Sequence, residues 1–364
     1  MELQYEVPEE NLKTFVAALH YLAQVGKELS IECDATQRVV FRALNDAHSA
    51  SGQIVFDRSF FSHARVHMPP PLQLTPSRIL PFVKAKVYAK SCCNLFRTLK
   101  HVQALRLTFA LEDLSPDEQQ ELRDSITSGQ DEEVEMDCRE LTWTLQCDFD
   151  VTKTHAMKVH ASQIMRAVFD RASCGSRWAT RQFHLSSLLA HIHHTNEVCV
   201  TCSDSHVKFE SYFPSTADGK AQLHTETAVE SAEFSEYVLA PGGGNDPSSI
   251  DNEVKLIFGL KELRALMAFC KASDLSDIKF YFSSGGSPVL FATEFASSAK
   301  FSVELTLSTV TTFLPAASQS RSSDDGMEVM PILHQALLQN EATSESDASQ
   351  PIRYLTHSKR PRIS

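Results

Sequence analysis

A short amphipathic helix followed by a strand is encoded in residues 11–33, which read NLKTFVAALHYLAQVGKELSIEC. The apolar residues recur at intervals of three and four, which places them on one face of a helix. They are Leu12, Phe15, Val16, Leu19, Leu22 and Ala23. Gly26 predicts the end of the helix, and residues 29–33 and 38–44 predict two strands around a polar turn.

The same helix-and-strands unit recurs three more times along the chain. Apolar residues at helical spacing begin near Cys92, Leu185 and Leu263, and strand-like segments follow each of them. The predicted strands are 104–111, 141–149 and 151–160, then 198–202 and 207–213, then 278–282, 289–295 and 301–308. One apolar stripe cannot be buried alone, so each pair of units is expected to share a sheet. The pattern predicts an α+β fold of two similar domains, each with two helices on an antiparallel sheet.

The repeats and the composition set the expected domain boundaries. We expect an N-terminal domain at 1–160, a connector at 161–182 and a C-terminal domain at 183–314. Residues 315–364 are rich in Ser, Asp, Glu and Gln, a composition typical of a disordered tail.

Composition and charge narrow the class of protein. The 364 residues are 42% hydrophobic, yet no apolar run approaches the roughly 18 residues that span a bilayer, so no membrane contact is expected. The acidic N-terminus predicts no secretion signal, and nine irregularly spaced cysteines predict free thiols in a reducing compartment. With 34 basic and 46 acidic side chains the net charge is −12, which excludes a protein coated in positive charge. A local basic surface remains compatible with that total.

The faces of the four helices that lie opposite the apolar stripes carry cations. These positions are Lys13 and His20, then Lys90, Arg97, Lys100 and His101, then His184 and His191, and finally Lys261, Arg264 and Lys271. The other residues on these faces are Ala17, Gln24, Asn94, Ser187, His194 and Ala268, so no Asp or Glu falls on them; Glu262 lies one residue aside. On any single helix, such a cationic face is equally well explained as an ordinary solvated surface. Four helices with the same kind of face favour contact with the phosphates of a nucleic acid, without recognition of the bases.

Two clusters invite an enzymatic interpretation, and both are disfavoured. Cys199 and Cys202 have CxxC spacing and follow His191, His193 and His194, as a zinc site would require. On a strand, however, positions three apart point to opposite faces. The acidic run at 131–135 is consecutive and therefore splayed, which does not suit a nuclease metal site, and there is no P-loop. We expect no catalytic residues, no cofactor and no metal; a zinc-dependent or nucleolytic enzyme is the less favoured alternative.

Four segments carry a resemblance to a known family. They read SCCNLFRTL at 91–99, VTKTH at 151–155, AVFDRASC at 167–174 and LKELRALMAF at 260–269. Together with the cationic helix faces, they resemble the Rad-nine family over roughly residues 1–314. That family has the PCNA fold of the sliding DNA clamps, and it supplies one subunit of the heterotrimeric checkpoint clamp with Rad-one and Hus-one.

The resemblance implies a nuclear, non-catalytic subunit of a ring-shaped clamp that a clamp loader places on damaged DNA. The ring would hold double-stranded DNA without sequence specificity and act as a platform for DNA damage checkpoint signalling and repair. In clamps the connector borders a hydrophobic pocket for client peptides, so Phe169 and Trp178 are candidate partner-binding residues. A homotrimeric replication processivity clamp is the alternative with the same fold.

The tail contains candidate regulatory sites. Ser318 and Ser349 precede glutamine, and Ser344 and Ser346 precede acids, so these four serines are phosphorylation candidates. The resemblance implies that a BRCT-repeat adaptor binds the phosphorylated tail. A terminal basic cluster is a candidate signal for nuclear import, and it contains Lys359, Arg360 and Arg362.

Overall fold

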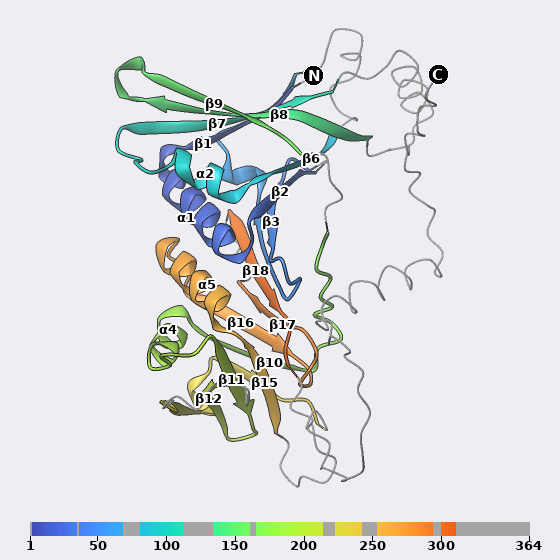
Figure 1. The fold of residues 1–364 in the computed structure, drawn as a ribbon, viewed down its shortest axis with the longest axis vertical. Helices are drawn as coiled ribbons and strands as arrows, with labels where there is room; N and C mark the ends of the chain where they lie inside the picture. Colours follow the sequence, from blue (N-terminus) through green and yellow to red (C-terminus); the bar gives the residue numbers. More distant parts are fainter. Residues whose placement is uncertain are drawn as a thin grey trace, which may run out of the picture.

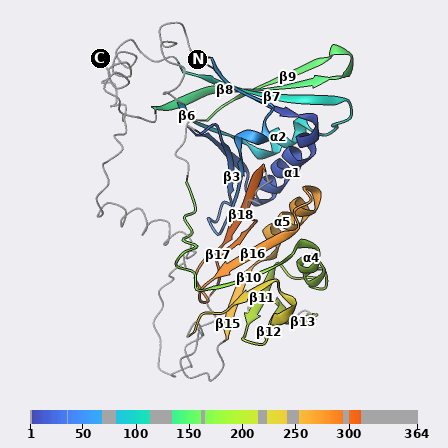
Figure 2. The same ribbon diagram turned by 180° about the vertical axis from the view of Figure 1, so that it is seen from behind.

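The helices of this protein lie together along one side of its sheets. The computed structural model describes residues 2–34, 36–67, 81–112, 134–160, 165–213, 223–241, 253–293 and 300–310. The described α-helices are α1 (Glu9–Val25), α2 (Ala89–Leu95), α4 (Gln182–Ala190) and α5 (Leu260–Ala272). Figures 1 and 2 show them stacked on the same side of the molecule, with the large sheet beside them. None of these helices has the length and apolar composition that crossing a membrane requires.

The strands divide between the two halves of the chain. Residues 2–160 form β1 (Glu2–Pro8), β2 (Glu28–Cys33), β3 (Val39–Leu44), β4 (Ala50–Phe56), β5 (His63–His67), β6 (Pro81–Tyr88), β7 (Val102–Leu111), β8 (Val134–Cys147) and β9 (Thr152–Lys158). Residues 165–310 form β10 (Ser176–Arg181), β11 (Glu197–Cys202), β12 (His206–Tyr212), β13 (Glu226–Glu230), β14 (Glu236–Val238), β15 (Val254–Gly259), β16 (Asp277–Phe282), β17 (Val289–Ala292) and β18 (Phe301–Leu307).

One large sheet runs through both halves. Its order is β14-β10-β16-β17-β18-β4-β3-β2-β6-β8-β7-β1-β5, with β9 added to β8. The halves join where β18 pairs antiparallel with β4, from Phe301 opposite Phe56 to Leu307 opposite Ala50. A second sheet has the order β13-β12-β11-β15. The fold is therefore mixed, with few helices on large, mostly antiparallel sheets.

The predicted apolar stripes are buried between the helices and the sheets. In α1 the ring of Phe15 is fully buried and lies 5.4 Å from Phe56 and 5.6 Å from Phe41, measured between ring centroids. The two halves also meet through their helices, because α1 packs against α5 and the ring of Tyr21 stacks on Phe269 at 5.7 Å. Burial of this stripe fixes which side of α1 remains in solvent.

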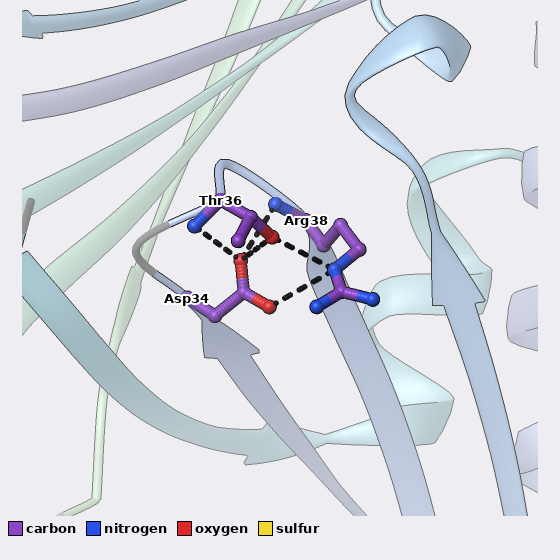
Figure 3. Close-up of polar contacts among 3 residues, drawn as sticks. All are labelled: Asp34, Thr36 and Arg38. Carbon is purple, nitrogen blue, oxygen red and sulfur yellow. Dashed lines mark hydrogen bonds and ion pairs between the residues drawn. The ribbon is translucent and has the colours of Figure 1, made fainter.

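The predicted polar turn between β2 and β3 is held by one aspartate. The Oδ1 atom of Asp34 accepts hydrogen bonds from the backbone N–H of Thr36 and of Arg38, at 2.9 and 3.0 Å (Figure 3). The guanidinium of Arg38 donates to the other carboxylate oxygen at 3.1 Å. This Asx-type arrangement is the reason that such a sequence turns instead of continuing as a strand.

The predicted helices and strands are confirmed, with differences in their bounds. The apolar spacing that begins at Cys92 continues through Leu99 to Val102, but the second helix ends at Leu95, so Leu99 lies in a loop and Val102 opens β7. The loop reverses at His101, whose φ of 71° is left-handed, and a helix cannot continue through that conformation. Six residues near the end of the predicted connector, Ser176–Arg181, form β10, which pairs with β14 and β16. The strands β1, β4, β5, β6, β10, β13, β14 and β15 were not predicted.

The turn between β8 and β9 is strained. Phe149 and Asp150 both have left-handed backbones, with φ of 59° and 58°, and the side chain of Phe149 is 95% exposed. Left-handed residues other than glycine cost free energy, while glycine costs entropy on folding. We expect Asp150→Gly to raise the free energy of unfolding by about 0.5–1 kcal/mol in urea titrations. Lys153→Gly in the extended β9 should lower it, and a destabilising Asp150→Gly would contradict the strain.

Candidate nucleic-acid interface

The outer faces of α1 and α5 present the predicted cations to solvent. In α5 the side chains of Lys261, Arg264 and Lys271 are exposed, while the alternating apolar residues are buried. In α1, Lys13 and His20 are exposed in the same way. The helix starts at Glu9, three residues earlier than the first predicted stripe residue, and this adds exposed acids before Lys13. These acidic side chains interact favourably with the positive, N-terminal end of the helix dipole.

The cations predicted on the second helix divide between the helix and the loop after it. Lys90 is exposed within α2, whereas Arg97, Lys100 and His101 lie exposed in the α2–β7 loop. The Nδ1 atom of His101 lies 2.8 Å from Oδ2 of Asp148, and this contact holds the pKa of the aspartate below its usual value. His101 therefore already has an anionic partner within the protein.

The third helix contributes less than predicted. His184 is half-buried, and its Nδ1 atom lies 3.1 Å from the hydroxyl of the buried Thr180. Its ring thus turns toward the sheet, and it does not add to the exposed cations. His191 is exposed at the C-terminal end of α4, followed by exposed His193 and His194.

Arg264 also has a structural contact. Its guanidinium donates a hydrogen bond to the backbone carbonyl of Ile192, just after α4, and so ties α5 to that segment. Arg264 and His101 are therefore partly committed within the protein. The remaining exposed positions are Lys13, His20, Lys90, Arg97, Lys100, His191, Lys261 and Lys271. We call these eight residues the helix surface.

The helix surface follows one continuous layer of helices. α2 packs against α1, α1 against α5, and α5 against α4. Figure 1 shows this layer as a column beside the sheets, and Figure 2 shows it again from behind. Long, exposed cationic side chains of this kind contact phosphates as point charges and carry no pattern for reading base edges.

The candidate zinc ligands do not converge. Cys202 pairs with Val207 on the core face of β11, whereas Cys199 pairs with Glu210 and points to the opposite face. Burial raises the pKa of Cys202 to about 12, which keeps it a neutral thiol. Among the described residues, one group of three possible ligands lies close together: Glu210, His224 and Glu226. The ammonium of Lys208 lies 3.4 Å from Glu210 and 3.6 Å from Glu226, in the place that a cation would take.

The connector residues chosen from the sequence differ in their surroundings. Trp178 is 1% exposed, with its ring 4.8 Å from Phe280 and 5.1 Å from Phe234. It is a core residue of β10 and offers no surface to a partner, because the rings of Phe209, Phe234, Phe280 and Phe291 surround it. Phe169 is half-buried and packs on the patch formed by Tyr281 and its neighbours in β17.

Two apolar connector side chains are more exposed than Phe169. Met165 is 51% and Val168 is 62% exposed. Met165 also borders a cavity of about 330 Å³ that Leu44, His48 and Tyr88 help to line. In the sequence, both are apolar residues in a segment that has neither helical nor strand spacing. They were not chosen as partner-binding candidates because Phe169 and Trp178 in the same segment are larger and aromatic.

Two ion pairs hold the connector to the sheet. Arg166 donates to the buried carboxylate of Glu32 from Nε at 3.1 Å and Nη2 at 3.0 Å, and Arg42 binds the same carboxylate. Further along, Arg171 pairs with Glu304 and lies over the ring of Tyr281. The two anchors belong to different halves of the chain, so the connector is fixed across the junction between β4 and β18.

Several predicted sites lie outside the described residues. These are the phosphorylation candidates Ser318, Ser344, Ser346 and Ser349, the import candidates Lys359, Arg360 and Arg362, and residues 131–133 of the acidic run.

Comparison with known proteins agrees with the resemblance found in the segments above. The family model named Rad9 matches residues 15–310. The chain is 23% identical to "DNA repair protein rad9" of Schizosaccharomyces octosporus, over 85% of this chain and 69% of that protein. It is 22% identical to "Cell cycle checkpoint control protein Rad9" of Drosophila melanogaster, over 79% of this chain and 53% of that protein. Since the family model covers most of the chain and every helix of the layer except the start of α1, the chain belongs to the Rad9 family.

Proposed function

We propose that this Rad9-family chain is a non-catalytic subunit of a ring-shaped heterotrimeric DNA clamp. It acts in the nucleus as a platform for DNA damage checkpoint signalling and repair, and a clamp loader places it on damaged DNA. The observation that carries this function is the continuous helix layer, with its exposed cations on one side and the large sheet on the other. Duplex DNA fits such a surface without sequence specificity, because phosphate contacts hold any sequence.

Open strand edges supply the means of ring closure. Within the described residues β9 pairs only with β8, and β13 only with β12. Figure 2 places these two strands at opposite ends of the molecule. A neighbouring strand can add to each edge through main-chain hydrogen bonds. We assign these edges to a Rad-one-like and a Hus-one-like subunit, with each half of the chain acting as one clamp domain.

The composition of the ring tests this function. Coexpression with the Rad-one-like and Hus-one-like subunits of the same species should yield a complex with one copy of each, measured by native mass spectrometry. The chain alone should sediment as a monomer. A stable homotrimer of the chain alone would favour a replication processivity clamp instead.

The connector is the proposed docking site for client peptides. Met165 and Val168 offer exposed apolar surface there, while Phe169 packs on the Tyr281 patch of the sheet. Trp178 is not part of this docking site, because it is buried in the core.

Phosphorylation of the tail is expected to control signalling without affecting the ring. Replacing Ser318, Ser344, Ser346 and Ser349 by alanine removes four acceptors of a group that carries roughly −2 charge and strong acceptor oxygens. We expect the variant to form the ring as the wild type does, and to lose most of its binding to a BRCT-repeat adaptor after kinase treatment. The measurement is a pull-down of kinase-treated rings on the immobilised adaptor. Undiminished adaptor binding would move the signalling site to the folded body.

A further inference from the structure

Two of the open strand edges among the described residues, those of β9 and β13, carry opposite charge, while β5, β14 and β15 also end their sheets. Residues 151–160, which contain β9, include Lys153, Lys158 and two histidines and no acidic residue. Residues 223–236, which contain β13, include four glutamates and neither Lys nor Arg. We call these segments the β9 edge and the β13 edge.

Both faces of the β9 edge are positive. Lys153 and His155 lie opposite Leu145 and Trp143 of β8, so they share the side of the sheet that covers the core. Lys158 lies opposite Glu140, on the other side. All three side chains are exposed. A strand that pairs with β9 therefore meets a cation whichever way its own side chains point.

The β13 edge is negative, and part of that charge is not neutralised by the described residues. Glu226 faces Glu210 across the β12–β13 pair, and the ammonium of Lys208 lies between the two carboxylates. Glu230 and Glu233 are exposed, and no ion pair to either is found among the described residues. These two glutamates are available to a neighbouring chain.

Protection against aggregation explains charge on an edge, but it does not explain the difference in sign. Lysine or glutamate alone at both edges would repel unwanted strands equally well. Opposite charges at opposite ends of one subunit make the two ends different to a neighbouring subunit. Main-chain hydrogen bonds to an added strand are nearly independent of sequence, so side-chain charge is the feature that can distinguish one neighbour from another.

We propose that the two edges select different neighbours by charge. The β9 edge takes a strand edge rich in Asp and Glu, and the β13 edge takes a strand edge rich in Lys and Arg. This selection rests on the proposed ring, because it is in the ring that both edges add to neighbouring sheets. Exchanging the two neighbours would place like charges together at both junctions, and the ring therefore closes in one order.

Two charge reversals test the selection, each with a matched control. Lys153→Glu with Lys158→Glu changes the β9 edge, and its control is Lys84→Glu with Lys255→Glu on the outer sheet surface. Glu230→Lys with Glu233→Lys changes the β13 edge, and its control is Glu9→Lys with Glu253→Lys. Each control makes the same change in net charge away from both edges. Circular dichroism and thermal unfolding establish that all four proteins fold.

Binding of each variant to the purified Rad-one-like and Hus-one-like subunits, one at a time, is measured at 100 and 400 mM salt. At the lower salt each edge variant should lose about 10- to 100-fold in affinity for one partner and stay within about 2-fold for the other, with the two variants losing different partners. The losses should shrink at the higher salt, where charges are screened. The controls should bind both partners as the wild type does.

The contrary outcomes are distinct. If the wild type binds both partners and the edge variants do so equally well, or both variants lose the same partner, selection by charge is wrong while the ring stands. If the wild type binds neither partner, the proposed function fails and the selection fails with it. If the wild type instead forms head-to-tail oligomers with itself that Lys153→Glu with Lys158→Glu abolishes, the neighbour is a second copy, and the choice of two different partners is overturned.

Discussion

Exchanging four cations of the helix surface for glutamate will abolish equilibrium binding of the assembled ring to a short linear duplex, whose open ends cannot trap it, at physiological salt. The substitutions are Lys13→Glu, Arg97→Glu, Lys261→Glu and Lys271→Glu, which sample α1, the α2–β7 loop and both ends of α5. Each takes away one cation that binds a phosphate and adds a repulsive carboxylate. The slope of log affinity against log salt should flatten by about 3–4 units, near 0.9 for each phosphate that the variant no longer neutralises. Arg264 and His101 are kept because they bind Ile192 and Asp148 within the protein.

The matched control reverses four lysines on the outer side of the sheets. Lys84, Lys86, Lys255 and Lys279 alternate with buried residues of β6, β15 and β16, so they point away from the helices. Reversing them changes the net charge by the same amount. Lys86 and Lys279 pair with Glu28 and Glu236, so circular dichroism first establishes that the control folds as the wild type does. Fluorescence anisotropy of a labelled duplex across a salt series measures both proteins. Equal losses of affinity in variant and control would mean that net charge, and not the helix surface, governs binding to DNA.

Trp178→Ala will lower the free energy of unfolding by about 3–5 kcal/mol, as truncation of a buried aromatic residue does. The ring is enclosed by Phe280, Phe234, Phe291 and Phe209, and its removal leaves a cavity that those rings cannot fill without rearranging. Urea unfolding monitored by circular dichroism gives the value.

Phe169→Ala is the comparison for that substitution. Phe169 is half-buried within the connector, so its truncation should cost about 1.5–2.5 kcal/mol, roughly half of the full burial value. If Trp178→Ala unfolds like the wild type and loses only the binding of client peptides, Trp178 is a contact residue and its place in the core is wrong.

Helices could be predicted from the sequence because their apolar residues repeat locally. The stripe from Leu12 to Leu22 and that from Leu263 to Cys270 were enough to identify α1 and α5 and the side that each leaves in solvent. Strand partners could not be predicted in the same way. The pairing of β4 with β18 joins residues near 50 to residues near 307, and no local pattern encodes such a partner. β10 was missed because its buried face carries Ser176, Trp178 and Thr180, of which only Trp178 is apolar, so no alternation of apolar and polar residues marks the strand.

The candidate site shows the same division. The exposure of Lys13, Lys261 and Lys271 follows from helical periodicity and could be predicted. The partners of His101, His184 and Arg264 could not be predicted, because they lie outside the elements that carry these three residues. They are Asp148 for His101, Thr180 for His184 and the carbonyl of Ile192 for Arg264. Trp178 was chosen as a large apolar residue in a connector, but six residues of that segment form a strand of the main sheet.

Topological retention on DNA tests the encircling clamp most directly. The assembled ring, placed by its clamp loader on a nicked circular plasmid, is washed in 500 mM salt, and the DNA is then either left circular or cut once. The ring should remain on the circle and leave the cut DNA by sliding off its ends, because encirclement does not depend on the salt-sensitive phosphate contacts. Equal loss of the ring from both forms of DNA, or equal retention on both, would contradict the claim that the ring closes around DNA with the helix layer facing it.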